Sequence, residues 1–379
     1  MKNFIRMTAI ALCLVVLMST LGSCRKQTEE GLVTVRVSLH SNEGSALGGI
    51  AVARDFFRQE GIDADITVVE SGPVQMAAMR ADNPSLDVGF IGAGVAWNPL
   101  DPSGNQLSFI FLDNLSDSEM FMANTSIGID QSSSRDQLFN ALRGQAVHME
   151  VGTTPGGWFK EFLSMLNAGR PASEQLWIDS ETAAYLQGYD APNNNPAFRV
   201  EVINTPNANL PAGMSSTGAD RILLAVGFAP ITTTIVRTNS DVVRVASTGT
   251  HMPDRYFPST WVARTRWLDE NPDVAQRLVN ALVRASFYRG ANEAQAEETM
   301  RAMERLIGRP DGSLSTASLV MPTREELRDW FSSPSSRGYD YMRALYNARV
   351  VNVPAGSTPK TLEQAMRFEF FTRALQEIN

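Results

Sequence analysis

The stretch from Val33 to Trp97 constrains the fold more than any other part of the chain, because segments of strand character alternate in it with segments of helical character. From Val33 to Leu39 a valine or leucine recurs at every second residue, which is the period of a β-strand. The order strand, helix, strand, helix, strand folds into a parallel sheet covered by helices. We expect strands over 33–39, 66–69 and 86–91, and helices from about 47 to 60 and over 74–81.

Each of these three strands ends in a polar or glycine-containing loop: His40–Gly44, Ser71–Pro73 and Gly92–Gly94. The carboxyl ends of parallel strands lie along one edge of a sheet, where the first turns of the following helices present free backbone N–H groups. Ligands of α/β proteins bind at such edges. We therefore predict that the three loops supply solute-binding residues, namely His40, Asn42, Glu43, Ser71, Gly72, Pro73, Gly92 and Ala93.

The same pattern recurs in the middle of the chain. A predicted strand over 147–151 is followed by the loop Gly152–Gly157 and by a helix expected from Trp158 to Leu166. Threonine hydroxyls and glycine amides before a helix can hold an anion or another polar group. We predict that Thr153, Thr154 and Gly156 bind solute, although a turn with an ordinary helix cap would have the same sequence.

Three aromatic residues lie close to the predicted site: two follow its loops and one stands at the end of a predicted strand. Trp97 and Trp158 could each form a flat wall against a ligand or pack in the core, and the sequence leaves both alternatives open. Phe228 stands where the strand predicted over 220–227 ends. We include all three among the candidate solute-binding residues.

The first 24 residues predict export from the cytoplasm. Lys2 and Arg6 flank the start of a short apolar segment, and Leu21–Cys24 resembles the lipobox at which bacterial lipoproteins are cleaved and acylated. We expect a lipoprotein signal peptide over 1–23, a lipid anchor on Cys24, a tether over 24–31, and a mature chain facing outside the cytoplasmic membrane, in the periplasm or at the cell surface. An ordinary signal peptide and an uncleaved membrane anchor are the alternatives.

Composition excludes several kinds of site. Cys13 and Cys24 are the only cysteines, and the leader accounts for both, so we expect no disulfide and no cysteine-dependent catalysis or metal binding. The three histidines are far apart in the sequence, which disfavours a metal site. The glycines of Gly92–Gly94 lack the spacing of a dinucleotide fingerprint. We therefore expect no cofactor.

The chain is acidic. Its formal net charge is −8, and removal of the leader, with Lys2 and Arg6 and no acid, leaves −10. No run of lysine and arginine interleaved with aromatic residues occurs, so we expect no binding to nucleic acid.

Length and the order of elements predict two lobes. About 350 residues after the leader are too many for one hydrophobic core. We expect an α/β fold in which each lobe is a mostly parallel sheet flanked by helices, with a two-strand hinge and extra C-terminal helices. The expected ranges are lobe one over 32–120, lobe two over 121–234 with an insertion at 171–196, and a return to lobe one over 235–379, where the β-branched runs at 232–237 and 242–246 make the crossing.

Several segments resemble one family. Gln59–Asp63, Ser71–Pro73 and Leu86–Gly92, in this order and behind a lipobox, resemble the first lobe of the sulfonate/nitrate/taurine and thiamine-precursor group of ABC-transporter substrate-binding proteins. The step Leu142–Val147 resembles the opening of the second lobe in that group. The resemblance implies a type II periplasmic-binding-protein fold, a monomeric receptor without catalysis, and an ABC permease and ATPase as partners.

The charge of the solute stays open at this stage. The loops of the predicted site contain Glu43 and Glu70 and almost no lysine or arginine. A sulfonate, nitrate or taurine-like solute would be held by backbone N–H groups and hydroxyls, whereas an aminopyrimidine, thiamine-precursor-like or other amine-bearing solute would place its amine on Glu43. A sensor or interaction lipoprotein that does not serve transport is a further alternative. An enzyme is another, because thiamine-pyrimidine synthases share the fold that the resemblance implies, but the mature chain lacks their cysteines.

Overall fold

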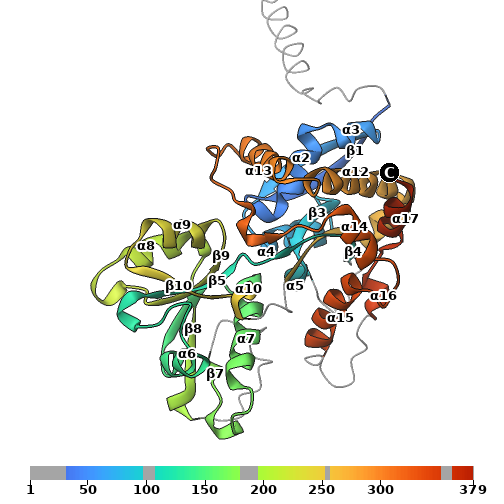
Figure 1. Cartoon of the computed structure of the whole chain (residues 1–379). Helices are drawn as coiled ribbons and strands as arrows, with labels where there is room; N and C mark the ends of the chain where they lie inside the picture. The colour runs from blue at the N-terminus through green and yellow to red at the C-terminus, as the bar shows by residue number, and fades with distance from the viewer. Residues whose placement is uncertain (1–30, 97–106, 180–194, 252–256, 351–360, 379) are drawn as a thin grey trace, which may run out of the picture.

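The computed structural model of the protein describes residues 31–96, 107–179, 195–251, 257–350 and 361–378, and these form two lobes (Figure 1). Cys24, the following tether residues up to 30, and Trp97 lie outside the described residues. The two lobes are built on two six-stranded sheets. Within the described ranges, none of the helices has the length and apolar character that crossing a membrane requires.

The first sheet has the strand order β12-β4-β11-β3-β1-β2. Strands β1, β2 and β3 are parallel to one another, and β11 runs antiparallel to both of its neighbours, β3 and β4. The buried face of β1 carries Val35, Val37 and Leu39, as the alternation in the sequence predicts. The bounds are β1 (Val33–His40), β2 (Ile62–Val69), β3 (Val88–Gly92), β4 (Leu107–Ser116), β11 (Phe257–Arg264) and β12 (Leu319–Val320).

The second sheet has the order β10-β5-β9-β6-β8-β7. Here β6, β7, β8 and β9 are parallel, and β5 runs antiparallel to its neighbours β9 and β10. The strand β7 and the helical turn before it lie within the expected insertion, whose residues 180–194 are outside the described ones. The bounds are β5 (Glu119–Asn124), β6 (Ala146–Met149), β7 (Trp177–Asp179), β8 (Arg199–Asn204), β9 (Leu224–Phe228) and β10 (Val242–Ser247).

Helices cover both sheets, and those at the C-terminus lie on the first lobe (Figure 1). Their apolar residues belong to one core with β1, β3, β4 and β11. In the first lobe the helices are α2 (Ala46–Ala53), α3 (Phe56–Gln59), α4 (Gly72–Arg80), α5 (Ala93–Ala96), α11 (Thr265–Glu270), α12 (Pro272–Arg289), α13 (Glu293–Ile307), α14 (Arg324–Trp330), α15 (Arg337–Val350), α16 (Leu362–Ala365) and α17 (Glu369–Glu377). In the second they are α6 (Arg135–Leu142), α7 (Thr154–Asn167), α8 (Leu210–Ser215), α9 (Ile231–Thr238) and α10 (Thr248–His251).

The chain passes between the lobes at two places. Between β4 and β5 the crossing consists of Asp117 and Ser118, and between β10 and β11 it follows β10 through α10. In each sheet the antiparallel inner strand, β5 or β11, is the first strand after a crossing. The α/β fold with two connecting segments is therefore as predicted.

The position of the return crossing differs from the expectation. Residues 232–237 were expected as a strand, but they belong to helix α9, and β10 pairs with β5 inside the second sheet. The second lobe therefore extends past residue 234 to the end of β10. Buried Thr232 and Ile235 are three residues apart and therefore lie on the same side of α9. Both are β-branched, which is why the sequence also suited a strand.

Candidate functional site

A cleft of about 630 Å³, part of it open to solvent, lies where the two lobes meet. It is formed at the carboxyl ends of β1, β2, β3, β6 and β9, at the first crossing and at the start of β11. The residues that line it are His40, Asn42, Glu43, Gly44, Glu70, Ser71, Gly72, Phe90, Ile91, Gly92, Val95, Ser116, Ser118, Glu119, Thr153, Thr154, Phe228, Ala229, Pro258 and Ser259.

Most of the predicted site residues come together in this cleft. The loops after β1, β2 and β3 contribute from the first lobe, and the loop after β6 and the end of β9 contribute from the second. This convergence follows from the parallel order of the strands, which brings their carboxyl ends to one edge. The predicted residues that line the cleft are His40, Asn42, Glu43, Ser71, Gly72, Gly92, Thr153, Thr154 and Phe228.

Other predicted residues do not line it. Pro73, Ala93 and Gly156 lie near the starts of α4, α5 and α7 and are not among the residues that line the cleft. Trp158 is 0% exposed and stacks on Phe162 in the second core, with ring centroids 5.1 Å apart. Because α7 begins four residues before the expected start, Trp158 lies in its second turn and packs against the sheet. Trp158 therefore packs in the core, which was the alternative considered above. Trp97 lies outside the described residues.

Sequence reasoning missed the contribution of the crossings. Ser118 of the first crossing lines the cleft together with Ser116 at the end of β4 and Glu119 at the start of β5. Pro258 and Ser259 line it from the start of β11. These residues do not follow parallel strands, so the rule that located the loops could not find them. The sequence feature that could have indicated them is the polar run Ser116–Glu119 between two apolar strands.

The loop after β1 is held by hydrogen bonds that aim its acidic side chain. Ser45, the residue before α2, donates its hydroxyl to the carbonyl of His40 at 2.5 Å and does not cap the helix with its side chain. Asn114 of β4 donates its amide to the carbonyl of Gly44 at 3.0 Å. The short turn between these bonds, Glu43–Ser45, presents Glu43 to the cleft.

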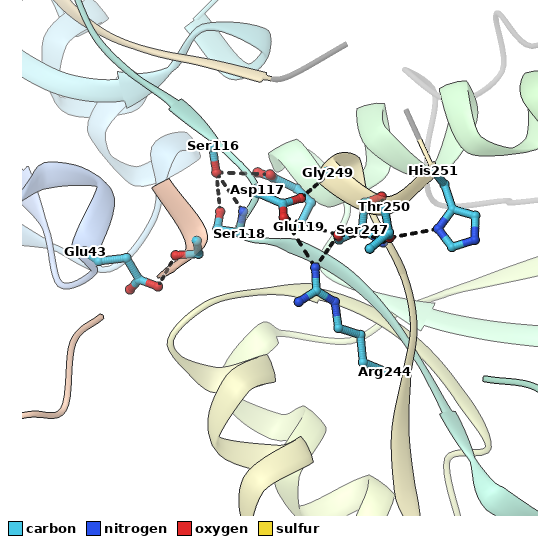
Figure 2. Close-up of polar contacts among 11 residues, drawn as sticks. Glu43, Ser116, Asp117, Ser118, Glu119, Arg244, Ser247, Gly249, Thr250 and His251 are labelled. Atoms are coloured by element: carbon cyan, nitrogen blue, oxygen red, sulfur yellow. Dashed lines mark hydrogen bonds and ion pairs between the residues drawn. The ribbon is translucent and has the colours of Figure 1, made fainter. Parts of the chain in front are cut away.

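Glu43 is buried, and only one of its two carboxyl oxygens has a hydrogen-bond partner. It is 2% exposed, and its Oε1 accepts a hydrogen bond from the Ser318 hydroxyl at 3.0 Å. The other oxygen, Oε2, has no hydrogen-bond partner. Burial raises the pKa of Glu43 to about 7, outweighing the hydrogen bonds and the charge of Arg309 that favour its ionised form. Figure 2 shows Glu43 at the left of the view and the residues of the first crossing nearer its centre.

Glu119 is the second buried acid of the cleft. It begins β5, is 2% exposed, and accepts a hydrogen bond at Oε2 from the Ser116 hydroxyl at 3.1 Å. The Thr154 hydroxyl also hydrogen-bonds to its side chain. Burial raises the pKa of Glu119, so both acids resist ionisation when no positive charge is near.

His40 lines the cleft as a neutral ring. Its Nε2 lies 2.8 Å from Oε1 of Gln75, which can only accept, so Nε2 carries the proton. Burial lowers the pKa of His40 to about 4. The edge of the ring contacts Phe90, with centroids 5.6 Å apart. His40 therefore adds no positive charge to the cleft near neutral pH.

The cleft is thus acidic. Three glutamates line it, Glu43, Glu70 and Glu119, and no lysine or arginine is among the lining residues that the structure describes. Within the same described ranges, no group of three or more histidine, cysteine, aspartate and glutamate side chains is placed to hold a metal ion.

Known proteins are similar to this chain over most of its length. The "Putative binding protein BAB2_1146" of Brucella abortus is 24% identical over 298 residues, 76% of this chain and 79% of that protein. The periplasmic nitrate-binding protein NrtA of Synechocystis superimposes with a TM-score of 0.64 at 13% identity, covering 92% of this chain and 89% of NrtA. No protein-family profile matches the sequence.

The chain has the periplasmic-binding-protein fold. A further structure with this fold is the ligand-binding component of an ABC-type import system from Staphylococcus aureus, with a TM-score of 0.62 at 14% identity, covering 90% of this chain and 98% of that one. Sulfonate-binding proteins superimpose as well, so the resemblance to the sulfonate and nitrate group is confirmed at the level of the fold. The periplasmic-binding-protein fold also occurs in the desulfurization enzyme DSZB, which superimposes with a TM-score of 0.55 at 13% identity.

A polar network joins the two crossings (Figure 2). Asp117 of the first crossing accepts hydrogen bonds from the Ser247 hydroxyl at 3.3 Å and from the backbone N–H of Gly249 at 2.5 Å. Its carboxylate also pairs with Arg244 at 3.3 Å. The backbone N–H of Asp117 donates to the carbonyl of Ser318 at 2.7 Å, and the Ser318 hydroxyl is the partner of Glu43. A continuous path of hydrogen bonds therefore joins the cleft to both crossings.

Proposed function

We propose that this protein is the solute-binding component of an ABC import system and captures a small polar organic solute between its two lobes. It needs no catalytic group for this task, because differential affinity of open and closed forms is enough to signal that a solute is bound. The lining residues of both lobes would form the solute site, with Glu119 and the serines of the crossings added to those predicted from the sequence. A lipid on Cys24 would hold the protein outside the cytoplasmic membrane, facing a permease.

One observation carries the proposal: the same cleft is lined by residues of both lobes and of the first crossing between them. The lobes already touch beside it. A Cβ built on Gly92 of the first lobe would lie 2.5 Å from Cγ2 of Thr154 in the second, and one on Gly152 would lie 3.7 Å from Pro73. A solute in the cleft would therefore contact both lobes at once and favour the closed arrangement.

Of the two solute classes that the sequence left open, the amine-bearing class fits this cleft better. An anion such as a sulfonate or nitrate would rely on the hydroxyls of Ser71, Thr153 and Thr154 and on backbone N–H groups. It would also lie close to three glutamates with no lining cation to offset them. An amine or amidine would supply the missing positive charge.

Native mass spectrometry of the purified full-length chain tests the proposal. We expect a small molecule bound at one per chain, which is released on unfolding and can be identified. Thr154→Trp, which fills the cleft, should abolish this mass, whereas Thr125→Trp, with the same bulk at an exposed position of the second lobe, should keep it. An empty wild-type chain that also gives no thermal shift with a panel of solutes would contradict the proposal and favour the interaction lipoprotein.

A further inference from the structure

We propose that Glu43 and Glu119 together hold one cationic nitrogen group of the solute, an ammonium or an amidinium, with one carboxyl supplied by each lobe. This inference rests on the proposed function and adds the chemistry of the recognised group. The two acids belong to different sheets: Glu43 follows β1 of the first, and Glu119 begins β5 of the second. Both line the same cleft, and each is 2% exposed.

Unsatisfied acceptors point to a donor-rich ligand. Among the described buried side-chain atoms without a hydrogen-bond partner, two belong to lining residues: Oδ1 of Asn42 and Oε2 of Glu43. Both are acceptors, and they are neighbours on one loop. Buried polar atoms are nearly always paired, so an unpaired acceptor in a cleft is an unfilled place for a donor. An ammonium has three N–H donors and an amidinium has four, and neither has an acceptor that these oxygens would repel.

The charges around the cleft also favour a cationic ligand. A buried carboxylate without a counter-charge is costly, and no lining lysine or arginine of the described chain compensates Glu43 or Glu119. Arg309 acts on Glu43 from outside the cleft, and Asp117 adds negative charge near Glu119. His40, on the same loop as Glu43, is neutral. A cation between the two acids would let both ionise and form charge-assisted hydrogen bonds.

This arrangement makes binding release protons. In the empty cleft near neutral pH Glu43 is partly protonated, since its pKa is about 7, and the pKa of Glu119 is raised as well. A bound cation lowers both values, and the displaced protons pass to the buffer. Because each acid moves with its own lobe, the same cation would also draw the lobes together.

Three probes with one ring separate the charge classes: benzamidine, which is cationic, benzamide, which is neutral, and benzenesulfonate, which is anionic. In calorimetric titrations of the full-length chain, we expect benzamidine to bind at one per chain, at least tenfold more tightly than the other two. Titrations in two buffers with different ionisation enthalpies should show proton release with benzamidine. Glu43→Gln and Glu119→Gln should each weaken benzamidine at least tenfold and reduce the proton release, whereas Glu174→Gln, an exposed acid outside the cleft, should change neither.

Several results would overturn the inference. These are benzenesulfonate binding as tightly as benzamidine, no benzamidine binding at millimolar concentration, unchanged benzamidine affinity in folded Glu43→Gln or Glu119→Gln, or tight zinc binding that these variants abolish. The chemistry of the solute identified by mass spectrometry distinguishes a failure of this inference from a failure of the proposed function. A bound solute without a cationic nitrogen would refute this inference and leave the proposed function intact. A chain with no bound solute and no thermal shift with the solute panel would refute both.

Discussion

Glu43 shows how a single residue couples the cleft to stability. Its pKa is raised from 4.5 to about 7 in the folded chain. Between pH 4.5 and pH 7 the folded state therefore keeps a proton that the unfolded state has already released. The stabilising effect of that proton is complete below pH 4.5 and is lost as the pH rises through 7. Because of this group, the stability of the empty protein should therefore decline between pH 4.5 and about pH 7 and level off above pH 7.

Glu43→Gln should remove this decline. Relative to wild type, the free energy of unfolding of the empty variant should rise by about 3 kcal/mol between pH 4.5 and pH 8, because glutamine mimics the protonated acid and cannot ionise. Denaturant unfolding across this pH range measures the difference. A difference that does not depend on pH would mean that Glu43 is ionised in the folded chain, contrary to the burial described here.

Asp113 is a buried acid with the opposite role. Its carboxylate pairs with Arg289 at 2.6 Å and accepts a hydrogen bond from Trp261 Nε1 at 2.9 Å, and both charged side chains are fully buried. Asp113→Asn leaves the Arg289 charge without its partner and should lower the free energy of unfolding by about 3–5 kcal/mol.

A matched control is Asp340→Asn, which breaks an exposed ion pair with Arg343. It should cost no more than about 1 kcal/mol. Denaturant midpoints measure both variants. Equal small losses would show that the Asp113–Arg289 pair contributes no more than a surface pair.

At the scale of elements, the contact between the end of β3 and the start of α7 offers a test of lobe closure. A methyl group on Gly92 would lie 2.5 Å from Cγ2 of Thr154. Gly92→Ala should therefore hinder closure and weaken solute binding roughly tenfold, the effect of about 1–3 kcal/mol of overpacking. Thr154→Ser removes only the obstructing methyl group and keeps the hydroxyl.

The double variant Gly92→Ala/Thr154→Ser should recover most of the affinity lost in Gly92→Ala, as measured by calorimetry with the co-purified solute. Additive losses would mean that the two lobes do not approach each other in the solute-bound form.

Elements also show how far the sequence alone could predict this molecule. The period of two in Val33–Leu39 and the loop positions after three strands could be predicted, because each depends on neighbours in the chain. The assignment of 232–237 to a helix could not, because β-branched residues suit both states and packing decides between them. Glu119 could not be predicted either, because its place in the cleft depends on how the chain crosses from the first sheet to the second.

At the scale of the whole molecule, the lipid anchor and the solute site should be independent. Cys24 precedes the described chain, and the cleft is formed by residues 40–259. Cys24→Ser should therefore abolish incorporation of a radiolabelled acyl chain and leave solute affinity unchanged. Detergent partition and calorimetry measure the two effects. Acyl label retained in the variant would show that the lipobox was wrongly assigned.

The central claim is that a solute with a cationic nitrogen is held between the lobes by acids from each. A crystal structure of the chain with its co-purified solute tests this most directly. We predict that the solute occupies the cleft, with its nitrogen group within hydrogen-bond distance of Glu43 and Glu119. A solute bound outside the cleft, or one that turns a sulfonate or other anionic group toward these two carboxyls, would contradict it.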